Sequence, residues 1–376
     1  MDCHTAVVGL GAVGSAVLYQ LARRGCDVVG IDQYSPPHGL GSSNGESRIT
    51  RLAMAEGDPY VQLVRRSHAI WREIEYQTST SLLTATGGLL IAPSQSDYLQ
   101  RTVQAARHKG ITHEILTASD IIKAFPQFNV ERKDIAYYEP EAGILRAERC
   151  IESQIALAQR LRAEIRLSQR VVEISDVQGG ARITTERSSI TAKNVVLAVG
   201  PWLHDFLDPG LSRQFIIYRQ VQFWFIVNDS SVQMPVFVWE LDDDRNGIYG
   251  LPGIDASFGT VKVASEQYET LTSPDTIERD VAPGEVDDIR ENVVEPLLPG
   301  LSGECRRAVA CMYTMTPDSN FVIDRLPSNC RLLIASPCSG HGFKHSAAVG
   351  EAIAELLMTG TSAIDLAAFR LSRFVP

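Results

Sequence analysis

The sequence predicts an α/β protein of two domains, one built on a parallel sheet and the other on a mainly antiparallel sheet. Three observations support this prediction: a strand, glycine turn, helix and strand over residues 5–32, two later apolar strands of the buried parallel type, and alternating apolar residues over 216–264. The length of 376 residues also favours two domains, at roughly 150 residues each.

The first elements are a strand expected over Thr5–Leu10, the turn Gly9–Gly14, a helix that ends near Gly25, and a second strand, Val28–Ile31, that leads into Asp32. In such a G-x-G-x-x-G turn, the first glycine permits the tight bend, the second lets a pyrophosphate approach the backbone, and the third lets helix and strand pack closely. The helix N-terminus faces the phosphates, and Asp32 can accept a hydrogen bond from a ribose hydroxyl. The pattern predicts a Rossmann-like site for FAD or NAD.

Two later segments favour FAD. Asn194–Gly200 and Leu332–Ala335 read as buried strands, and a helix is expected after Lys344. The N-terminus of that helix could face the pyrimidine edge of a flavin, where the reduced ring carries negative charge. An NAD enzyme would not require the last fifth of the chain to return to its cofactor.

Alternation of apolar side chains predicts the second, antiparallel sheet. The alternating positions are Phe223, Phe225, Val227, Val236, Val238, Val261 and Val263.

Composition and charge exclude several classes of protein. Lys and Arg number 35 against 45 Asp and Glu, and the net charge of −10 argues against a nucleic-acid binder. No apolar run approaches the ~18 residues of a membrane span. The 7 cysteines form no CxxC pair and no zinc spacing, so we expect no metal and, without a signal-peptide pattern, a reducing, cytoplasmic location. Nothing in the sequence signals an oligomer, and a monomer is expected.

Motifs spread over nearly the whole chain resemble the monomeric sarcosine oxidase and N-methyltryptophan oxidase family, which are FAD-dependent amine oxidases of the D-amino-acid-oxidase type. They occur in the family's order. The matching segments are Gly9–Gly14, Gly41–Arg51, Tyr60–Val61 with Trp71, Gly143–Leu145, Tyr218–Gln220, Asn246–Gly250, Cys311–Thr314, Phe321–Asp324 and Ser339–Lys344. The resemblance implies a discontinuous FAD-binding domain, residues 1–85, 145–215 and 310–376, and a substrate domain, residues 86–144 and 216–309.

Three basic residues are candidates for the substrate site. Arg48 and Arg51 are three positions apart, which would place them on one face of a helical turn, and by spacing alone they read as a solvated basic face. The resemblance implies instead that Arg48 lies beside the flavin ring and that Arg51 and Lys344 bind the substrate carboxylate. Arginine suits this role because its planar fork donates two parallel hydrogen bonds.

Lys262 stands between Val261 and Val263, and strand alternation places it on the face opposite both valines. A lysine in such a strand usually faces solvent. The resemblance implies that it reaches the flavin N5 through water, where a cation stabilises the negative charge that develops on dioxygen.

Cys311 matches the cysteine that carries the flavin in this family, as a thioether to the 8α carbon, although a cysteine in an apolar stretch is usually a buried hydrophobe. Cys338 is a second thiol near the expected flavin, and we rank it behind Cys311. Tyr249 and Tyr313 match tyrosines that line the substrate cavity, and His341 is expected to shape the loop beside the flavin. The implied FAD contacts are Gly9, Gly11, Val13, Gly14, Asp32, Ser42, Ser43, Arg48, Val172, Gly200, Cys311, Met312, Gly340, Gly342 and Lys344.

Glu266 departs from the family pattern, because the family commonly has a histidine four residues after the lysine. The oxidase chemistry is still expected, but a carboxylate there changes the charge of the pocket, so the substrate need not be sarcosine. The resemblance predicts an FAD-dependent oxidase of a secondary amino acid, N-methylated or cyclic, that produces hydrogen peroxide and needs no protein base if the amine binds unprotonated. The alternatives are a flavin amine dehydrogenase with another electron acceptor and a non-catalytic flavoprotein scaffold.

Overall fold

The computed structural model describes residues 1–229, 234–241 and 247–374. Asn246, quoted above in a matching segment, lies outside these residues. None of the helices in the described ranges has the length and apolar character of a membrane span.

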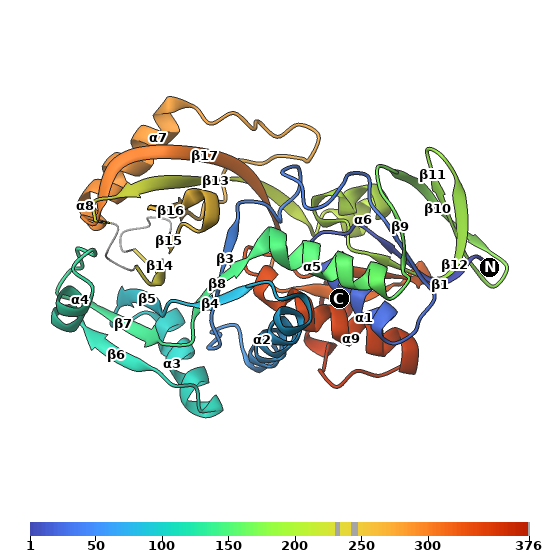
Figure 1. The fold of residues 1–376 in the computed structure, drawn as a ribbon, viewed down its shortest axis with the longest axis horizontal. Coiled ribbons are helices and arrows are strands. Elements are labelled where there is room, and N and C mark those ends of the chain that lie inside the picture. The colour runs from blue at the N-terminus through green and yellow to red at the C-terminus, as the bar shows by residue number, and fades with distance from the viewer. Residues whose placement is uncertain (230–233, 242–246, 375–376) are drawn as a thin grey trace.

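An eight-stranded sheet at one end of the molecule carries the predicted Rossmann-like pattern (Figure 1). Its strands are β1 (Cys3–Val8), β2 (Val28–Ile31), β9 (Glu164–Arg166), β10 (Val171–Val177), β11 (Gly180–Thr185), β12 (Ser189–Leu197), β18 (Val322–Leu326) and β19 (Asn329–Ser336). β9, β2, β1, β12 and β19 run parallel, with Val8 opposite Leu197 and Val196 opposite Leu333. The predicted α/β fold is confirmed, as are the buried strands expected before Gly200 and at Leu332–Ala335.

The helices beside this sheet are α1 (Ala12–Arg23), α2 (Asp58–Thr78), α5 (Ala147–Arg160) and α9 (Ser346–Thr359). α1 packs on β1, β2 and β19, α5 and α9 pack against α1, and α2 packs against α9. α1 follows the glycine turn, and α9 packs against it so closely that a Cβ on Gly350 would come within 2.5 Å of the Ala16 side chain. The last helix of the chain is thus held beside the first.

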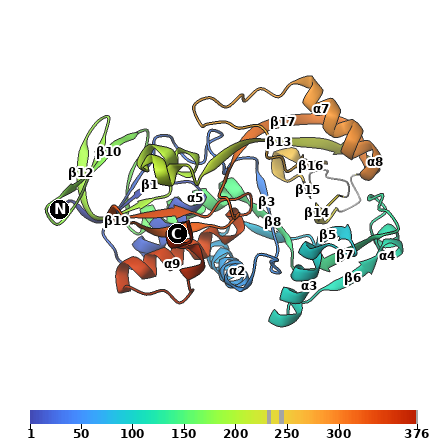
Figure 2. The same ribbon diagram turned by 180° about the vertical axis from the view of Figure 1, so that it is seen from behind.

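The second eight-stranded sheet is mainly antiparallel, as predicted, and fills the other end of the molecule (Figure 2). In spatial order its strands are β17 (Leu301–Met315), β13 (Ile216–Val227), β16 (Thr260–Ser265), β15 (Ile248–Pro252), β14 (Val236–Trp239), β5 (Gly88–Pro93), β7 (Asp134–Glu139) and β6 (Glu114–Thr117). β14 and β5 form a parallel pair. The accompanying helices are α3 (Asp97–Lys109), α4 (Ala118–Ala124), α7 (Pro283–Ile289) and α8 (Glu295–Leu297), and α6 (Pro209–Ser212) precedes β13. The division into an FAD-binding domain and a substrate domain stays a prediction, and β17 crosses its 309/310 boundary.

The predicted helical turn at Arg48 and Arg51 is wrong. Residues Ser47–Thr50 form strand β3, which pairs with β8 (Gly143–Arg146), and β4 (Leu83–Ala85) pairs with the other edge of β8. Arg48 lies opposite Leu145 in this small antiparallel sheet. Pairing with a strand almost 100 residues away decides the local conformation, and spacing within the segment could not reveal it.

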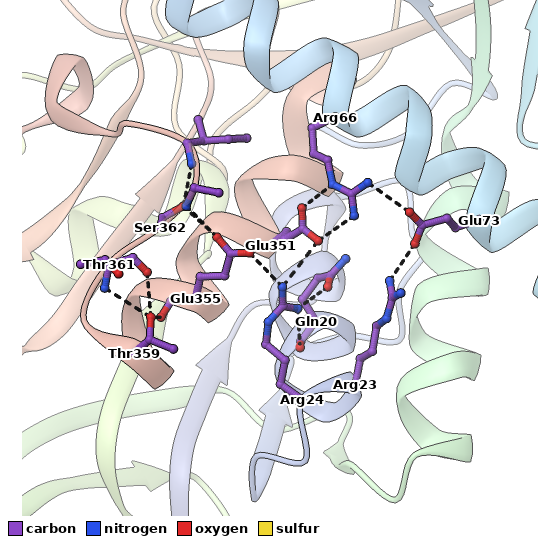
Figure 3. Close-up of polar contacts among 12 residues, drawn as sticks. Gln20, Arg23, Arg24, Arg66, Glu73, Glu351, Glu355, Thr359, Thr361 and Ser362 are labelled. Carbon is purple, nitrogen blue, oxygen red and sulfur yellow. Dashed lines mark hydrogen bonds and ion pairs between the residues drawn. The ribbon is translucent and has the colours of Figure 1, made fainter.

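A network of charged side chains ties α1, α2 and α9 together (Figure 3). Glu351 of α9 accepts two hydrogen bonds from the Arg66 guanidinium of α2, one of them at 2.8 Å, and Arg24, directly after α1, lies 3.5 Å from the same carboxylate. Burial alone would raise the pKa of Glu351, but the hydrogen bonds and charge of Arg66 hold it below its ordinary value.

We expect Glu351→Gln to lower the free energy of unfolding by about 1–2 kcal/mol, because it removes the charge from a mostly buried, doubly bonded carboxylate. Since the folded-state pKa is lowered, this difference should be fully present above the unfolded pKa of about 4.5 and vanish as the pH falls through the folded value. Urea denaturation at several pH values measures it. Glu73→Gln is the control, at a more exposed carboxylate that pairs with Arg23 and with the other side of Arg66, and it should cost about 0.5 kcal/mol or less. Equal losses in the two variants would contradict the account.

Candidate active site

A cavity extends from the carboxyl ends of the parallel strands to the antiparallel sheet. Gly9 follows β1 and Gly200 follows β12 in its wall, while Lys262 of β16 and Tyr313 of β17 line it from the second sheet. The carboxyl ends of parallel strands are where open α/β sheets bind ligands.

The glycine turn has the geometry that a dinucleotide site needs. Gly9 has a φ of +86°, and a Cβ there would lie 2.5 Å from the Ala198 carbonyl oxygen. A Cβ on Gly14 would lie 1.7 Å from the carbonyl oxygen of Gly9, so the helix could not approach the turn with any larger residue. Asp32 fixes the turn, because its carboxylate accepts hydrogen bonds from the backbone N–H groups of Leu10 and Tyr34, each at 2.7 Å. Its remaining lone pairs are available to a ribose.

Four buried polar atoms in the cavity wall have no hydrogen-bond partner within the described protein. They are the hydroxyl oxygens of Ser42 and Ser47, the side-chain oxygen of Gln222 and Nδ1 of His341. Leaving such atoms unpaired is costly, so they are ready to bond to a ligand. With the glycine turn at one end and these groups further along, the wall fits an extended, polar cofactor such as FAD.

Arg48, in strand β3, and Arg51, directly after it, both line this cavity. The Arg48 guanidinium donates to the backbone oxygens of Ser42, Asn44 and Ser47 at 2.6–2.9 Å and lies 5.9 Å from the centre of the Phe343 ring. These bonds fix its orientation in the cavity wall.

The Arg51 guanidinium donates to the backbone oxygen of Ala53 and to the hydroxyl of Tyr98, whose own hydroxyl donates to Glu56 at 3.2 Å. Arg51 and Tyr98 line the cavity. A guanidinium has five N–H donors, so a fork held from behind in this way keeps donors for an anion.

Lys344 lines the same part of the cavity from the start of the segment that leads into α9. Its ammonium donates to the His341 carbonyl oxygen at 2.9 Å. Burial and the nearby Arg51 charge lower the pKa of Lys344 to about 7, against the opposing influence of Glu56 and Glu266. The charge on Lys344 therefore changes within the physiological range.

Binding of a simple carboxylate that lacks an amine should weaken as the pH rises above about 7. The protonated form of Lys344 attracts the anion, and the sign follows because the charged form prevails below its pKa. We expect at least about a tenfold increase in Kd between pH 6 and pH 9, from loss of one charged hydrogen-bond donor. Spectral titration of the flavin with such an anion measures it. Lys344→Met should show weak binding with little pH dependence, and an unchanged pH dependence in that variant would assign the effect elsewhere.

Lys262 is fully enclosed. Its ammonium donates to the backbone oxygens of Gly45 at 2.8 Å and Ser47 at 2.7 Å, and it lies 5.5 Å from the centre of the Trp224 ring. Burial and the charge of Arg48 lower the pKa of Lys262, whereas its two acceptors and the ring face favour the ammonium form. Lys262 also lines the cavity, so its strand does not turn it to solvent.

The two candidate thiols differ in position. Cys338 belongs to the cavity wall, where its sulfur lies 2.8 Å from the Ser336 hydroxyl and burial raises its pKa to about 11. Cys311 lies behind the wall and accepts a hydrogen bond at 3.5 Å from Gln222, which does line the cavity. Burial raises the pKa of Cys311, but the charges of Arg48 and Lys262 oppose this. The pKa of Cys311 nevertheless stays above its ordinary value, so the two cations are the groups that would stabilise a thiolate against burial.

Tyr249 and Tyr313 face each other in the cavity wall, with the hydroxyl of Tyr313 donating to that of Tyr249 at 3.1 Å. Burial raises the pKa of both, so they stay neutral. Gly340, at φ +78°, leaves room for the Tyr313 ring, since a Cβ there would lie 3.0 Å from it. The His341 ring stacks on Phe321 at 4.8 Å, beside the cavity.

The structure brings most of the predicted site residues into this one wall. These are Gly9, Gly11, Val13, Asp32, Ser42, Ser43, Arg48, Arg51, Gly200, Tyr249, Lys262, Met312, Tyr313, Gly340, Gly342 and Lys344. Gly14, in the glycine turn, and Cys311, in β17, both lie behind the wall. The Val172 side chain is 56% exposed, and its neighbour Val171 lines the cavity in its place, because successive residues of a strand face opposite ways.

Sequence reasoning did not identify Ser47, Tyr98 or Gln222 as part of the wall. Gln222 had a detectable signal, because it is a polar residue between Val221 and Phe223 in an apolar strand. No sequence signal identified Tyr98, because it contacts Arg51 from helix α3, 47 residues along the chain.

Comparison with known proteins agrees with this geometry. Residues 4–356 match the family described as DAO, FAD dependent oxidoreductase. The chain is 34% identical over 369 residues to a monomeric sarcosine oxidase of Streptomyces avermitilis, covering 96% of this chain and 95% of that protein. It is 35% identical over 378 residues to a monomeric sarcosine oxidase of a Bacillus species, covering 98% and 95%. To an N-methyl-L-tryptophan oxidase of Yersinia pestis it is 33% identical over 379 residues, covering both chains completely.

Solved structures share the fold. NikD, described as an unusual amino acid oxidase essential for nikkomycin biosynthesis, superposes with a TM-score of 0.86 at 22% identity, over 98% of this chain and 97% of NikD. An L-proline dehydrogenase from P. horikoshii superposes with a TM-score of 0.84 at 20% identity, over 99% and 98%. From the family match, the full-length relatives and the cavity, we conclude that this chain is an enzyme of the FAD-dependent oxidoreductase family.

Proposed function

We propose that this enzyme oxidises a secondary amino acid, N-methylated or cyclic, at its C–N bond and reduces dioxygen to hydrogen peroxide. The observation that best supports the proposal is that Arg51 and Lys344 line the same cavity as the glycine turn and Lys262. Relatives named as oxidases of sarcosine and N-methyl-L-tryptophan support the substrate class. A monomeric, cytoplasmic enzyme remains our prediction.

FAD, when bound, supplies a two-electron acceptor for the hydride that leaves the carbon beside nitrogen. The glycine turn and Asp32 would hold its adenosine and pyrophosphate, while Ser42, Ser47 and Gln222 offer unpaired polar atoms further along. We also propose that Cys311 forms a thioether with the 8α carbon of FAD. The two cations near its sulfur support this, and its place behind the wall calls for the direct test in the Discussion.

Arg51 and Lys344 would hold the substrate carboxylate, and this orients the amine and its neighbouring carbon. Charge-assisted hydrogen bonds are the strong ones, and a fixed carboxylate reduces the ways in which the substrate can lie. Tyr249 and Tyr313 close the cavity with neutral hydroxyls that hydrogen-bond to each other. The imine product hydrolyses in water.

Replacing Arg51 or Lys344 with methionine should lower kcat/KM for a carboxylate-bearing substrate about 30-fold, equivalent to about 2 kcal/mol for one lost charged partner. A matched amine without a carboxylate should be a poor substrate of the wild type and should lose little more in the variants. The ratio of the two substrates therefore separates the anion site from general damage. Equal losses for both substrates would exclude these residues as the carboxylate clamp.

A substrate panel read by peroxide release tests the proposed function. The panel comprises sarcosine, N-methyl-L-tryptophan, proline, glycine and the corresponding amines without a carboxylate. We expect turnover of at least one secondary amino acid and much slower turnover of primary and carboxylate-free amines. Flavin reduction without peroxide would favour the dehydrogenase, and no flavin reduction by any amino acid would favour the non-catalytic scaffold.

A further inference from the structure

Glu266 is a carboxylate that lines the cavity together with Arg51 and Lys344. Glu266 directly follows β16. Its backbone N–H donates to the backbone oxygen of Gly247 at 2.9 Å, and this hydrogen bond continues the pairing of β16 with β15. Because side chains alternate along a strand, Glu266 shares a face with Lys262, and both line the cavity.

The Glu266 carboxylate is held on one side and free on the other. Its Oε2 accepts a hydrogen bond from the Tyr268 hydroxyl at 3.1 Å, whereas no described residue donates to Oε1. Burial raises the pKa of Glu266, against the Tyr268 hydrogen bond and the charges of Lys344 and Arg51. The ionisable groups close enough to influence it are Glu56, Lys344, Arg51, Tyr268, Tyr98, Tyr249 and Tyr313.

The other carboxylates of the cavity wall are already engaged. Among the described lining residues these are Asp32, bonded to two backbone N–H groups at the glycine turn, and Asp205, paired with Arg170 at 3.3 Å. Among the described lining residues, Glu266 is therefore the carboxylate that remains available to a substrate. It stands there among the cationic side chains of Arg48, Arg51, Lys262 and Lys344.

An amino acid in neutral water is a zwitterion, and its two ends match this distribution of charge. Its carboxylate fits Arg51 and Lys344, but its ammonium is repelled by the cations and cannot release hydride from the neighbouring carbon until it loses a proton. Free alkylammonium groups have a pKa of about 10, so little neutral amine exists at pH 7. A group that takes this proton inside the cavity would let the abundant zwitterion serve as the substrate.

We propose that Glu266 binds the substrate ammonium and accepts its proton before oxidation. In this step an N–H bond breaks, its electron pair stays on nitrogen, and an O–H bond forms at the free Glu266 oxygen. The ammonium and carboxylate become a neutral amine and a carboxylic acid, with no change of oxidation state. This inference rests on the proposed function, since it requires an amino-acid substrate.

His341 is the rival acceptor. Its Nε2 lies 3.2 Å from the Ser319 carbonyl oxygen, which leaves Nδ1 as the acceptor, but that atom is buried without a partner. Burial and the charge of Lys344 lower the pKa of His341 to about 4. His341 also lines the cavity, but its Nδ1 is fully buried and weakly basic, which makes it a poorer acceptor than the free carboxylate oxygen of Glu266.

The test is the pH profile of kcat/KM for wild type and Glu266→Gln, with anaerobic flavin reduction followed as well. If Glu266 takes the proton, the kcat/KM of the wild type should be nearly independent of pH between the pKa of Glu266 and the pKa of the amine, apart from the titration of Lys344. The variant must use neutral amine, so its kcat/KM should rise about tenfold per pH unit up to about pH 10. The ratio of wild type to variant should fall accordingly, about 100-fold from pH 7 to pH 9.

The Kd of a carboxylate without an amine, measured in both proteins at each pH, corrects for changes in the charge of Lys344. A loss in Glu266→Gln that is equal at every pH would reduce Glu266 to a positioning residue and overturn the proposal. A pH slope that appears in His341→Asn and not in Glu266→Gln would also overturn it. If the wild type reduces its flavin with no amino acid, it is the proposed function that has failed, which is a different result.

Discussion

Lys262→Met should slow the reoxidation of the reduced enzyme by air about 1000-fold, corresponding to a charge interaction of about 4 kcal/mol. Electron transfer to dioxygen creates negative charge in a cavity largely shut off from water. The Lys262 ammonium, 1% exposed and fixed by two carbonyl oxygens and the Trp224 ring, is positioned to stabilise that charge. Methionine keeps the length of the side chain and removes the charge.

Reduction of the flavin by substrate under anaerobic conditions should change far less in this variant, because no oxygen charge develops in that half-reaction. Stopped-flow absorbance follows the two half-reactions separately. Since burial lowers the pKa of Lys262, wild-type reoxidation should also slow as the pH rises through that pKa, while the variant should not respond. Wild-type reoxidation rates in Lys262→Met would remove Lys262 from the oxygen site and favour the dehydrogenase.

Cys311→Ala should abolish covalent retention of the flavin, an all-or-none effect. In the wild type, acid precipitation should leave yellow colour in the protein pellet, and in the variant the colour should pass to the supernatant. The thiolate is the nucleophile, and Arg48 and Lys262 are the charges that would stabilise it against the burial that raises the pKa of Cys311.

Cys338→Ala is the matched control, because Cys338 is a second, partly buried thiol whose sulfur lies in the cavity wall beside Ser336. We expect this variant to keep its colour in the pellet. Colour lost in Cys338→Ala and retained in Cys311→Ala would transfer the linkage to Cys338.

Local sequence patterns predicted much of the fold and part of the candidate site. The glycine turn, its flanking strands and the helix after it are set within 30 residues, so periodicity alone located them. Strand alternation placed Lys262 on the face opposite its two neighbouring valines, but its place at the cavity was predicted only from the family resemblance. Glu266 stood out because a carboxylate replaces the usual histidine.

Long-range pairing set the features that the sequence did not reveal. Arg48 lies in a strand because β3 pairs with β8, and Tyr98 reaches Arg51 from a helix of the other sheet. The position of Cys311 behind Gln222 depends on the pairing of β17 with β13. No spacing within one segment contains this information.

The most direct measurement of the central claim is to mix oxidised holoenzyme anaerobically with a secondary amino acid and then admit air. We predict that the flavin absorbance bleaches with the amino acid, stays unchanged with the matching amine that lacks a carboxylate, and recovers in air with one peroxide formed for each flavin. Bleaching by both compounds would contradict the Arg51 and Lys344 anion site. Bleaching without recovery in air would contradict an oxidase.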